Sequence, residues 1–484
     1  MKKSIAFSTV FAQFSRFLSY ITRISLLQKI FLCKINFLVE NFQFMYYNDL
    51  VQCECRAHAR YSDSRKKILS PAVTYLKEEN QMKKFLALAL ALIMALSLFA
   101  CGKKEDPQPE TKDIKVGFIT LHDENSTYDL NFINGAKEAI KNLGLTDANY
   151  ILKTNVPEGQ ECYETACDLV DNGCTIIFAD SFGHEPYMIQ AAQKYPDVQF
   201  CHSTGTRAHT ENLANYHNAF ASIYEGRYLA GIAAGMKLNE MIEAGQFTKD
   251  EAKMGYVGAF TYAEVISGYT SFYLGAKSVC PTVTMDVTFT GSWYDEALEK
   301  EGAQKLIDGG CKLISQHADS LGAPTACENA KVPNVSYNGS TKDAAPNTYI
   351  ISSRINWAPY YEYAIKAVMD GKTIDTDWTG NLATGSVVLT ELNEAVAAKG
   401  TAEALKAAQE KLEKGELHVY DTATFTVKGA PLSVDHMADV DTDEAYTPDT
   451  KVVKDGYFAE SEFRSAPYFD LEIDGITRLD VNFG

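Results

Sequence analysis

Histidine, carboxylate and hydroxyl side chains come together in the run QHADS, where His317 and Asp319 alternate and a serine follows. Such a set can perform nucleophilic catalysis when a base is placed beside the hydroxyl. The chain has no G-x-S-x-G elbow to expose a nucleophile, no GxxxxGKS phosphate loop and no HExxH pair for zinc. The sequence therefore predicts a protein that is not an enzyme, with no cofactor and no metal.

Aromatic residues lie where predicted strands end, which favours binding instead. Trp293 and Trp357 each come at the end of a strand-like run in the second half of the chain. Tyr128 follows the first strand, Phe182 ends another, and Tyr224 opens a long helix. Rings at these places could stack on a flat ligand. The alternative for each is packing: a surface loop for Tyr128, helix entry for Phe182, and hinge or core for the others.

Polar side chains at the same strand ends could bind the edge of such a ligand. Asp319 and His317 share one face if their strand continues, and Asn338 ends the run VPNVSYN. Glu264 starts a helix directly after a strand. Carboxylates at these places also serve as helix caps or capping charges, so both roles stay open for Glu264 and Asp319.

These residues need a parallel sheet to position them, and the pattern supplies one. Strand-like and helix-like runs alternate from residue 114, and Gly144 and Gly173 end two of the helices. The same alternation restarts with a helix over 225–242 that has small residues on one side. Alternation of this kind predicts α/β architecture with two doubly wound parallel-sheet lobes, a hinge and a central cleft where ligands bind.

Several blocks of sequence carry a family resemblance: DSFGHEPYMIQAAQKYPDVQFCHSTGTR, KMGYVGAFTYAEVISGYTSFYLGAKSVCPTV, FTGSWYDEALEKEGAQKLIDGGCKLISQHADS and ISSRINWAPYY. Over about residues 114–430 the chain resembles the basic membrane protein (BMP) family of bacterial lipoproteins, which are solute-binding components of ABC importers with a type I periplasmic-binding-protein fold. The resemblance implies a purine nucleoside or free base bound between the lobes.

We expect clamshell closure about hinge strands near 218–222, 350–356 and 374–380, and the resemblance implies that the closed form then delivers the ligand to an ABC permease. The nucleoside-binding branch carries D-x-S-F-N-Q after the first strand, where this chain reads STYDLNFINGAKEA. That branch also has an aspartate where Asn338 stands. Nucleoside and free base therefore both remain open.

The predicted boundaries follow from this pattern. Residues 114–219 and about 353–375 form the N-terminal lobe, and 220–352 with about 376–430 form the C-terminal lobe. Residues 431–484 are acidic and turn-rich, and we expect a surface segment there. Near the hinge, Arg227 is expected to pair with a carboxylate rather than to touch the ligand.

A secretion signal lies inside the chain. Residues 82–100 read MKKFLALALALIMALSLFA, a short basic start followed by an apolar stretch, and Cys101 comes next. This resembles a lipobox, in which the cysteine is lipidated. Residues 101–113 would then be a tether that holds the protein at the extracytoplasmic face of the cell membrane. Residues 1–81 are interpreted as a mis-assigned upstream extension, the alternative being a genuine membrane-associated segment.

Charge restricts the partners. The whole chain has a net charge of −18, and the part after residue 100 is more acidic still. A field of this sign disfavours nucleic acid and also binding to an acidic membrane by charge. We expect a monomer whose partners are a small molecule and a permease. The competing interpretations are a surface adhesion or sensor lipoprotein, and the same fold with a sugar-like ligand.

The cysteines show neither CxxC pairs nor metal-type spacing, and most lie in apolar runs. We expect small buried hydrophobic residues. Only Cys162 and Cys167 are placed so that a disulfide is considered.

Overall fold

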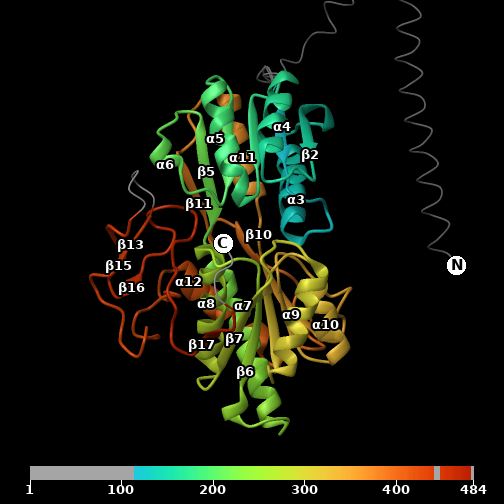
Figure 1. Ribbon diagram of the computed structural model, residues 1–484, viewed down its shortest axis with the longest axis vertical. Coiled ribbons are helices and arrows are strands. Elements are labelled where there is room, and N and C mark those ends of the chain that lie inside the picture. The colour runs from blue at the N-terminus through green and yellow to red at the C-terminus, as the bar shows by residue number, and fades with distance from the viewer. Residues whose placement is uncertain (1–113, 441–446, 481–484) are drawn as a thin grey trace, which may run out of the picture. The chain divides into compact units, whose positions relative to one another are not determined.

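The computed structural model describes residues 114–440 and 447–480 (Figure 1). Cys101 and the leader over 82–100 lie outside the described residues, so the signal peptide, the lipidation and the status of residues 1–81 stay predictions. Among the helices of the described part, none combines the length and the apolar character needed to cross a bilayer.

The first sheet has six strands in the order β11-β5-β4-β3-β1-β2, and all neighbours are parallel. Its strands are β1 (Val116–Ile119), β2 (Tyr150–Lys153), β3 (Ile176–Ala179), β4 (Gln199–Ser203), β5 (Tyr216–Ala221) and β11 (Asp377–Gly380). The helices of this lobe are α3 (Thr127–Asn142), α4 (Gln160–Asp171), α5 (Glu185–Lys194), α6 (Ala208–Glu211) and α11 (Ala358–Asp370). Gly144 and Gly173 have φ of 71° and 89°, which confirms that they end α3 and α4.

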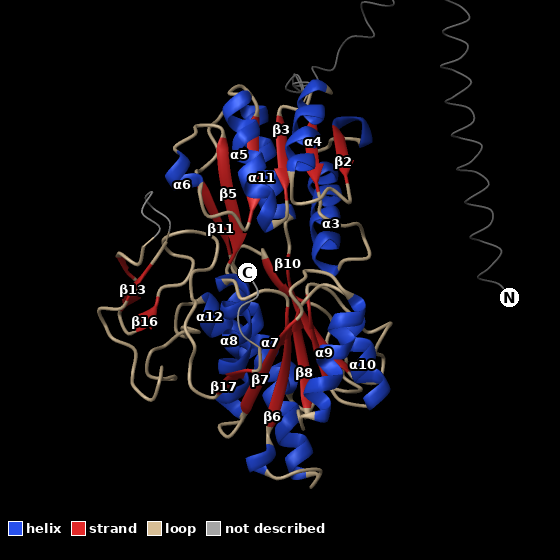
Figure 2. Ribbon diagram, in the orientation of Figure 1, coloured by secondary structure: helices blue, strands red, loops and turns tan. Residues whose placement is uncertain are grey.

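The second sheet has the order β12-β10-β9-β8-β6-β7-β17, with only β12 antiparallel to its neighbour. Its strands are β6 (Lys253–Gly258), β7 (Thr284–Phe289), β8 (Leu313–His317), β9 (Asn334–Tyr337), β10 (Tyr349–Ile355), β12 (Val387–Leu389) and β17 (Ile476–Arg478). The helices are α7 (Ile223–Glu243), α8 (Ala263–Val279), α9 (Glu296–Asp308), α10 (Gly322–Ala330) and α12 (Thr401–Glu413). Figure 2 shows the strands of the two sheets as separate groups with helices packed against them. The predicted two-lobed α/β fold is confirmed.

The chain passes between the two sheets three times. It leaves the first sheet after β5, returns after β10, and leaves again after β11. Because β11 pairs with β5, residues up to Gly380 belong to the first lobe, a few residues beyond the predicted boundary. The connections therefore lie at 222, 356–357 and 381–386.

Close packing of α7 on α8 explains the small residues of the first of these helices. A Cβ atom on Gly231 would lie 2.0 Å from the carbonyl oxygen of Phe272, and one on Gly275 would lie 2.0 Å from that of Tyr228. Only glycine allows this approach. The same helix carries Arg227 into the second lobe, where it is fully buried.

The C-terminal segment packs into the second lobe instead of only covering it. It forms two small hairpins, β13 (Met437–Ala438) with β14 (Thr450–Lys451) and β15 (Val453–Lys454) with β16 (Tyr457–Phe458). Strand β17 then joins the edge of the second sheet beside β7. Phe469 and Ile473 between them are buried.

The seven cysteines of the described residues are free, and six of them are buried. Cys162 and Cys167 are therefore not bridged. Burial raises the pKa of Cys201 to about 12, which is typical of an inert core thiol.

Candidate ligand-binding site

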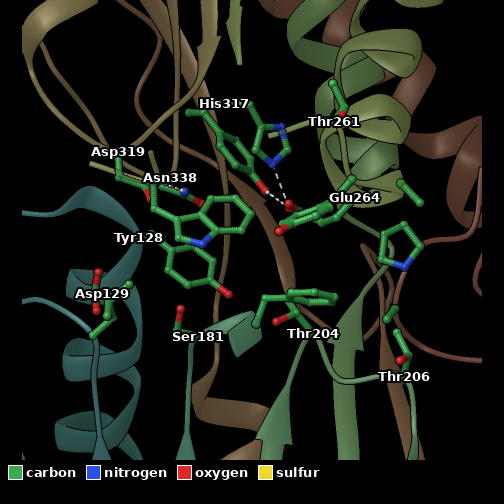
Figure 3. Close-up of a pocket in the computed structure, with 18 of the residues that line it drawn as sticks. Tyr128, Asp129, Ser181, Thr204, Thr206, Thr261, Glu264, His317, Asp319 and Asn338 are labelled. Carbon is green, nitrogen blue, oxygen red and sulfur yellow. Dashed lines mark hydrogen bonds and ion pairs between the residues drawn. The ribbon is translucent and has the colours of Figure 1, made fainter. Parts of the chain in front are cut away.

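A cavity of about 380 Å³ lies between the two lobes. Almost all of the residues that line it follow the carboxyl ends of parallel strands, where doubly wound folds bind ligands. The first lobe contributes Leu121, His122, Tyr128, Asp129, Ser181, Phe182, Thr204 and Thr206. The second contributes Thr261, Tyr262, Ala263, Glu264, Trp293, His317, Asp319, Tyr337 and Asn338. Figure 3 shows the polar members converging from both sides. The C-terminal segment adds Arg464, Ala466, Pro467 and Asp470.

In the N-terminal lobe, hydrogen bonds at the start of α3 fix the positions of the cavity residues Tyr128 and Asp129. Ser126 caps this helix and accepts from the backbone N–H of Asp129, while its hydroxyl donates to the Asp129 carboxylate at 2.5 Å. The hydroxyl of Tyr128 donates to the carbonyl oxygen of Asp180 at 3.0 Å. With its polar end occupied, Tyr128 offers its ring to the cavity.

Asp129 and Asp180 are both buried, but their pKa values are shifted in opposite directions. Burial acts to raise the pKa of Asp129, but hydrogen bonds from His122 and Ser126 outweigh it and leave that pKa below its usual value. Burial and then the neighbouring charge of Asp129 hold the pKa of Asp180 well above its usual range. In the N-terminal lobe, Asp129 is therefore the ionised carboxylate at the cavity, and burial favours the neutral form of Asp180 behind it.

Aromatic rings from both lobes line the cavity. Trp293 packs edge-on against Phe260 with ring centroids 4.9 Å apart, and Tyr262 lies 5.9 Å from the indole. Phe182 of the first lobe lies 5.0 Å from Tyr262 of the second. These rings form an aromatic wall of the cavity on which a flat ligand could stack.

A chain of hydrogen bonds runs from the core of the second lobe to the cavity. Arg227 Nη2 donates to the hydroxyl of Tyr256 at 3.2 Å, and that hydroxyl lies 3.1 Å from His317 Nδ1. His317 Nε2 lies 2.7 Å from Glu264 Oε1. Arg227 also donates to the carbonyl oxygen of Ser336, and it lies over the ring of Phe272 at 4.9 Å.

The direction of these bonds assigns the proton on His317. Because a guanidinium can only donate, the Tyr256 oxygen accepts from Arg227 and its hydrogen goes to His317 Nδ1. Nε2 then carries the histidine proton and donates to Glu264. Tyr337 donates to the same Glu264 oxygen at 3.4 Å. One carboxylate oxygen is thus held by two donors, and the group faces the cavity as an acceptor for an N–H or O–H of a ligand.

Asp319 and Asn338 sit at the junction of the lobes. Asn338 Nδ2 donates to Asp319 Oδ1 at 3.1 Å. Burial and then the charges of Asp129 and Glu299 raise the pKa of Asp319 well above its usual range. Three bonds cross the cleft here. The N–H and the hydroxyl of Thr127 donate to the Asp319 carbonyl at 3.1 and 3.2 Å, and Asn131 Nδ2 donates to the Asn338 carbonyl at 2.7 Å. The lobes are therefore in contact at the edge of the cavity.

Most of the residues singled out from the sequence come together in this cavity. Its lining includes Tyr128, Phe182, Glu264, Trp293, His317, Asp319 and Asn338. Whether they bind a ligand stays a prediction, since the structure holds none.

Two predicted positions need correction because they lie away from the cavity. Trp357 is 1 % exposed and stacks on Phe132 with centroids 4.3 Å apart, in the core beneath the hinge. Tyr224 donates from its hydroxyl to the carbonyl oxygen of Glu460 at 3.2 Å. Both belong to the packing alternatives. Arg227 does stay out of the cavity, but its hydrogen bonds are to a carbonyl and hydroxyls, not to a carboxylate.

Sequence reasoning missed several residues of the cavity. His122 lies in the loop before α3, Asp129 follows Tyr128 in α3, and Tyr262 lies two residues before Glu264, so proximity to the predicted residues was the available signal. Arg464 and Asp470 lie in the C-terminal segment, where no predicted strand end indicated a ligand site.

The fold and the cavity together define a two-lobed solute-binding protein. The chain belongs to the Bmp family, described as ABC transporter substrate-binding protein PnrA-like, whose model matches residues 118–422. The family is one of binding components of transporters and not of enzymes, and the sequence-based resemblance is confirmed.

Relatives and solved structures agree with this membership. The chain is 33% identical over 261 residues to a purine-binding protein from Brucella abortus, a match that covers 53% of this chain and 69% of that protein. It is 32% identical over 250 residues to a putative ABC transporter glucose-binding protein from Haloferax volcanii, covering 52% of this chain and 60% of that protein. An ABC transporter solute-binding protein from Aeropyrum pernix has the same fold, with a TM-score of 0.53 at 18% identity over 63% of this chain and 92% of that one.

Proposed function

We propose that the protein binds a purine base or purine nucleoside in the cavity between its lobes and delivers it to an ABC permease. The observation that carries this proposal is the combination of an aromatic wall at Trp293, Tyr262 and Phe182 with the fixed acceptor at Glu264. A purine offers two flat faces and N–H donors at its edge, and both features find partners here.

The location of the protein is part of the proposal. A lipid on Cys101 would hold the binding unit at the outer face of the membrane, where ligand arrives from outside. The relative from Brucella abortus, named as purine-binding, supports the ligand class.

The lobes would close on the ligand by rotation about the three connections. Ligand favours closure only as far as it binds the closed form better than the open one. Contacts that exist only when the lobes meet, such as Asn131 to Asn338, help the closed form.

A sugar ligand is a second candidate because several carboxyl groups line the cavity and can accept from hydroxyls. The relative from Haloferax volcanii, named as a putative glucose-binding protein, also favours it.

A thermal-shift panel separates the two ligand classes. The purified protein is unfolded and refolded to remove carried-over ligand, then tested with adenine, guanine, hypoxanthine, their ribonucleosides, ribose and glucose. Ligand at 100 times its Kd stabilises by about 2.7 kcal/mol. We expect one purine class to raise the Tm. A shift with sugars alone would replace purine by sugar, and no shift with either class would refute small-molecule import of both kinds.

A further inference from the structure

The C-terminal strap, defined here as Glu460–Asp474, lies beyond the residues that the family model matches, which end at 422. It nevertheless contributes Arg464, Pro467 and Asp470 to the lining of the ligand cavity. A segment outside the family's common core thus forms part of its ligand site.

The strap is anchored to the second lobe. Phe469 stacks on Tyr420 with ring centroids 4.3 Å apart and planes 14° apart. Strand β17 follows the strap directly and pairs with β7. At the other end, Tyr224 donates to the carbonyl oxygen of Glu460. These contacts fix both ends of the strap on one lobe.

Its middle reaches the first lobe. The backbone N–H of Ser465 donates to Asp377 Oδ2 at 2.6 Å, and Asp377 begins the edge strand β11 of the first sheet. The strap therefore spans the cleft, and Figure 1 shows the C-terminal segment beside the point where the two lobes meet.

The cavity side of the strap has a fixed shape and an acidic end. Arg464 Nε donates to the carbonyl oxygen of Ala466 at 3.0 Å, and its Nη2 donates to that of Pro467 at 2.9 Å. The guanidinium thus holds the turn and is also attracted by Asp377 and Asp439. Asp470 is exposed and still lines the cavity, so it lies where the cavity opens to solvent.

We propose that the C-terminal strap is a specificity element that closes one side of the cavity and rejects phosphorylated ligands. The turn at Arg464–Pro467 limits the space, and the Asp470 carboxylate repels an anion at the opening. The inference rests on the proposed function only in requiring a small neutral ligand. It predicts uptake of bases, nucleosides or free sugars in preference to their phosphates.

The test compares Asp470→Ala and Asp470→Lys with Asp435→Ala. Asp435 is an exposed acid of the same C-terminal region that pairs with Lys451, and it does not line the cavity. Affinities are measured for two pairs, adenosine with adenosine monophosphate and glucose with glucose 6-phosphate. One surface charge is worth about 1 kcal/mol, or about fivefold. We expect the phosphate to gain about fivefold over its partner in D470A and about 25-fold in D470K, with no change in D435A.

A measurement without ligand separates this proposal from the proposed function. Iodide quenching of Trp293 fluorescence reports anion entry, and Trp293→Phe gives the background from the other two tryptophans. D470A and D470K should raise quenching by iodide, whereas D470K should leave quenching by neutral acrylamide nearly unchanged. If no ligand of the thermal-shift panel binds the wild type, the proposed function fails; if neither ligand pair binds, iodide quenching alone decides the role of the strap. An unchanged affinity ratio where a pair binds, or unchanged iodide quenching where none binds, overturns the role of the strap.

Discussion

The two lobes present carboxyl groups to the same cavity in different ways. In the N-terminal lobe, Asp129 and Asp180 lie close together, and burial with the neighbouring charge of Asp129 raises the pKa of Asp180 well above its usual range. In the C-terminal lobe, Glu264 is linked through His317 and Tyr256 to the buried cation of Arg227.

The difference indicates a division of roles. A carboxylate held by donors that trace back to a cation has a fixed orientation before ligand arrives, which reduces the cost of binding. In the first lobe, Asp129 is held by Ser126 and His122 instead of by a link to a buried cation, and it lies beside Asp180, whose neutral form burial favours. We therefore expect the second lobe to select the polar edge of the ligand, and the first lobe to complete the enclosure.

The largest effect should come from removing the buried cation of Arg227, from which the hydrogen-bond chain to Glu264 starts. Arg227→Met leaves the Ser336 carbonyl and the Tyr256 and Ser315 hydroxyls without their donor. Unsatisfied buried groups cost about 1–3 kcal/mol each, so we expect a loss of at least about 3 kcal/mol in the free energy of unfolding, measured by urea titration. Ligand affinity should fall as well.

Two control variants are matched to Arg227→Met, one in each lobe: Arg354→Met in the second and Asp180→Asn in the first. Arg354→Met changes a half-buried arginine of β10 and should cost less than about 1 kcal/mol. Asp180→Asn replaces an acid whose neutral form is favoured by burial with a neutral amide of similar shape, and it should also cost little. If D180N destabilised the protein as much as R227M, the proposed contrast between the lobes would be wrong.

The next-largest effect should distinguish two carboxyl groups of the second lobe, Glu264 and Asp319. Glu264→Gln places an amide where two donors and a ligand all need an acceptor, and we expect a loss of about 2–3 kcal/mol in binding, or roughly 30–150-fold in Kd. Asp319→Asn should cost less than about fivefold, because burial already favours the neutral form of Asp319. Calorimetric titration with the purine found in the panel measures both. Equal losses would show that Asp319 also binds as a carboxylate.

Substitutions of two tryptophans distinguish a residue of the cavity, Trp293, from a residue of the core, Trp357. Trp293→Ala should weaken purine binding by about 1–3 kcal/mol, the value of one stacked base, with little change in Tm. Trp357→Ala should lower the free energy of unfolding by about 3–5 kcal/mol, because its fully buried ring packs on Phe132. A binding defect in W357A at a temperature where it stays folded would return Trp357 to the site.

This pair also shows where sequence reasoning succeeds. Both tryptophans come after strands, and that pattern is correct for each. In parallel sheets the loops after strands face the cleft, which is why Glu264, Asp319 and Asn338 were found from alternation and resemblance together. The surroundings of Trp357 differ because the chain crosses to the other lobe at that residue, and its ring is therefore covered by α3.

Other features depend on contacts between distant segments and could not be predicted. The link from Arg227 to Glu264 joins four elements, and nothing in the local sequence of α7 indicates it. The strap was expected on the surface because its composition is acidic and turn-rich. Its buried aromatic residues, such as Phe469, find their partner at Tyr420, and only the folded chain brings the two together.

The last effect depends on pH and extends the comparison to the strap, which also carries a buried carboxyl group. Burial raises the pKa of Glu460 to about 8 from an ordinary value of 4.5. The unfolded chain therefore loses this proton before the folded protein does, so its contribution to stability is complete below about pH 4.5 and is lost as the pH rises toward 8. Glu460→Gln should reduce the fall in unfolding free energy over this range by no more than about 1.4 kcal/mol per pH unit. The control is Glu462→Gln, at an exposed acid whose pKa is lowered, and it should leave the slope of unfolding free energy between pH 5 and 8 intact. Glu225 and Glu299 have pKa values of about 7, so part of this slope remains in either variant. An unchanged slope in E460Q would mean that water reaches Glu460 and that the strap opens in solution.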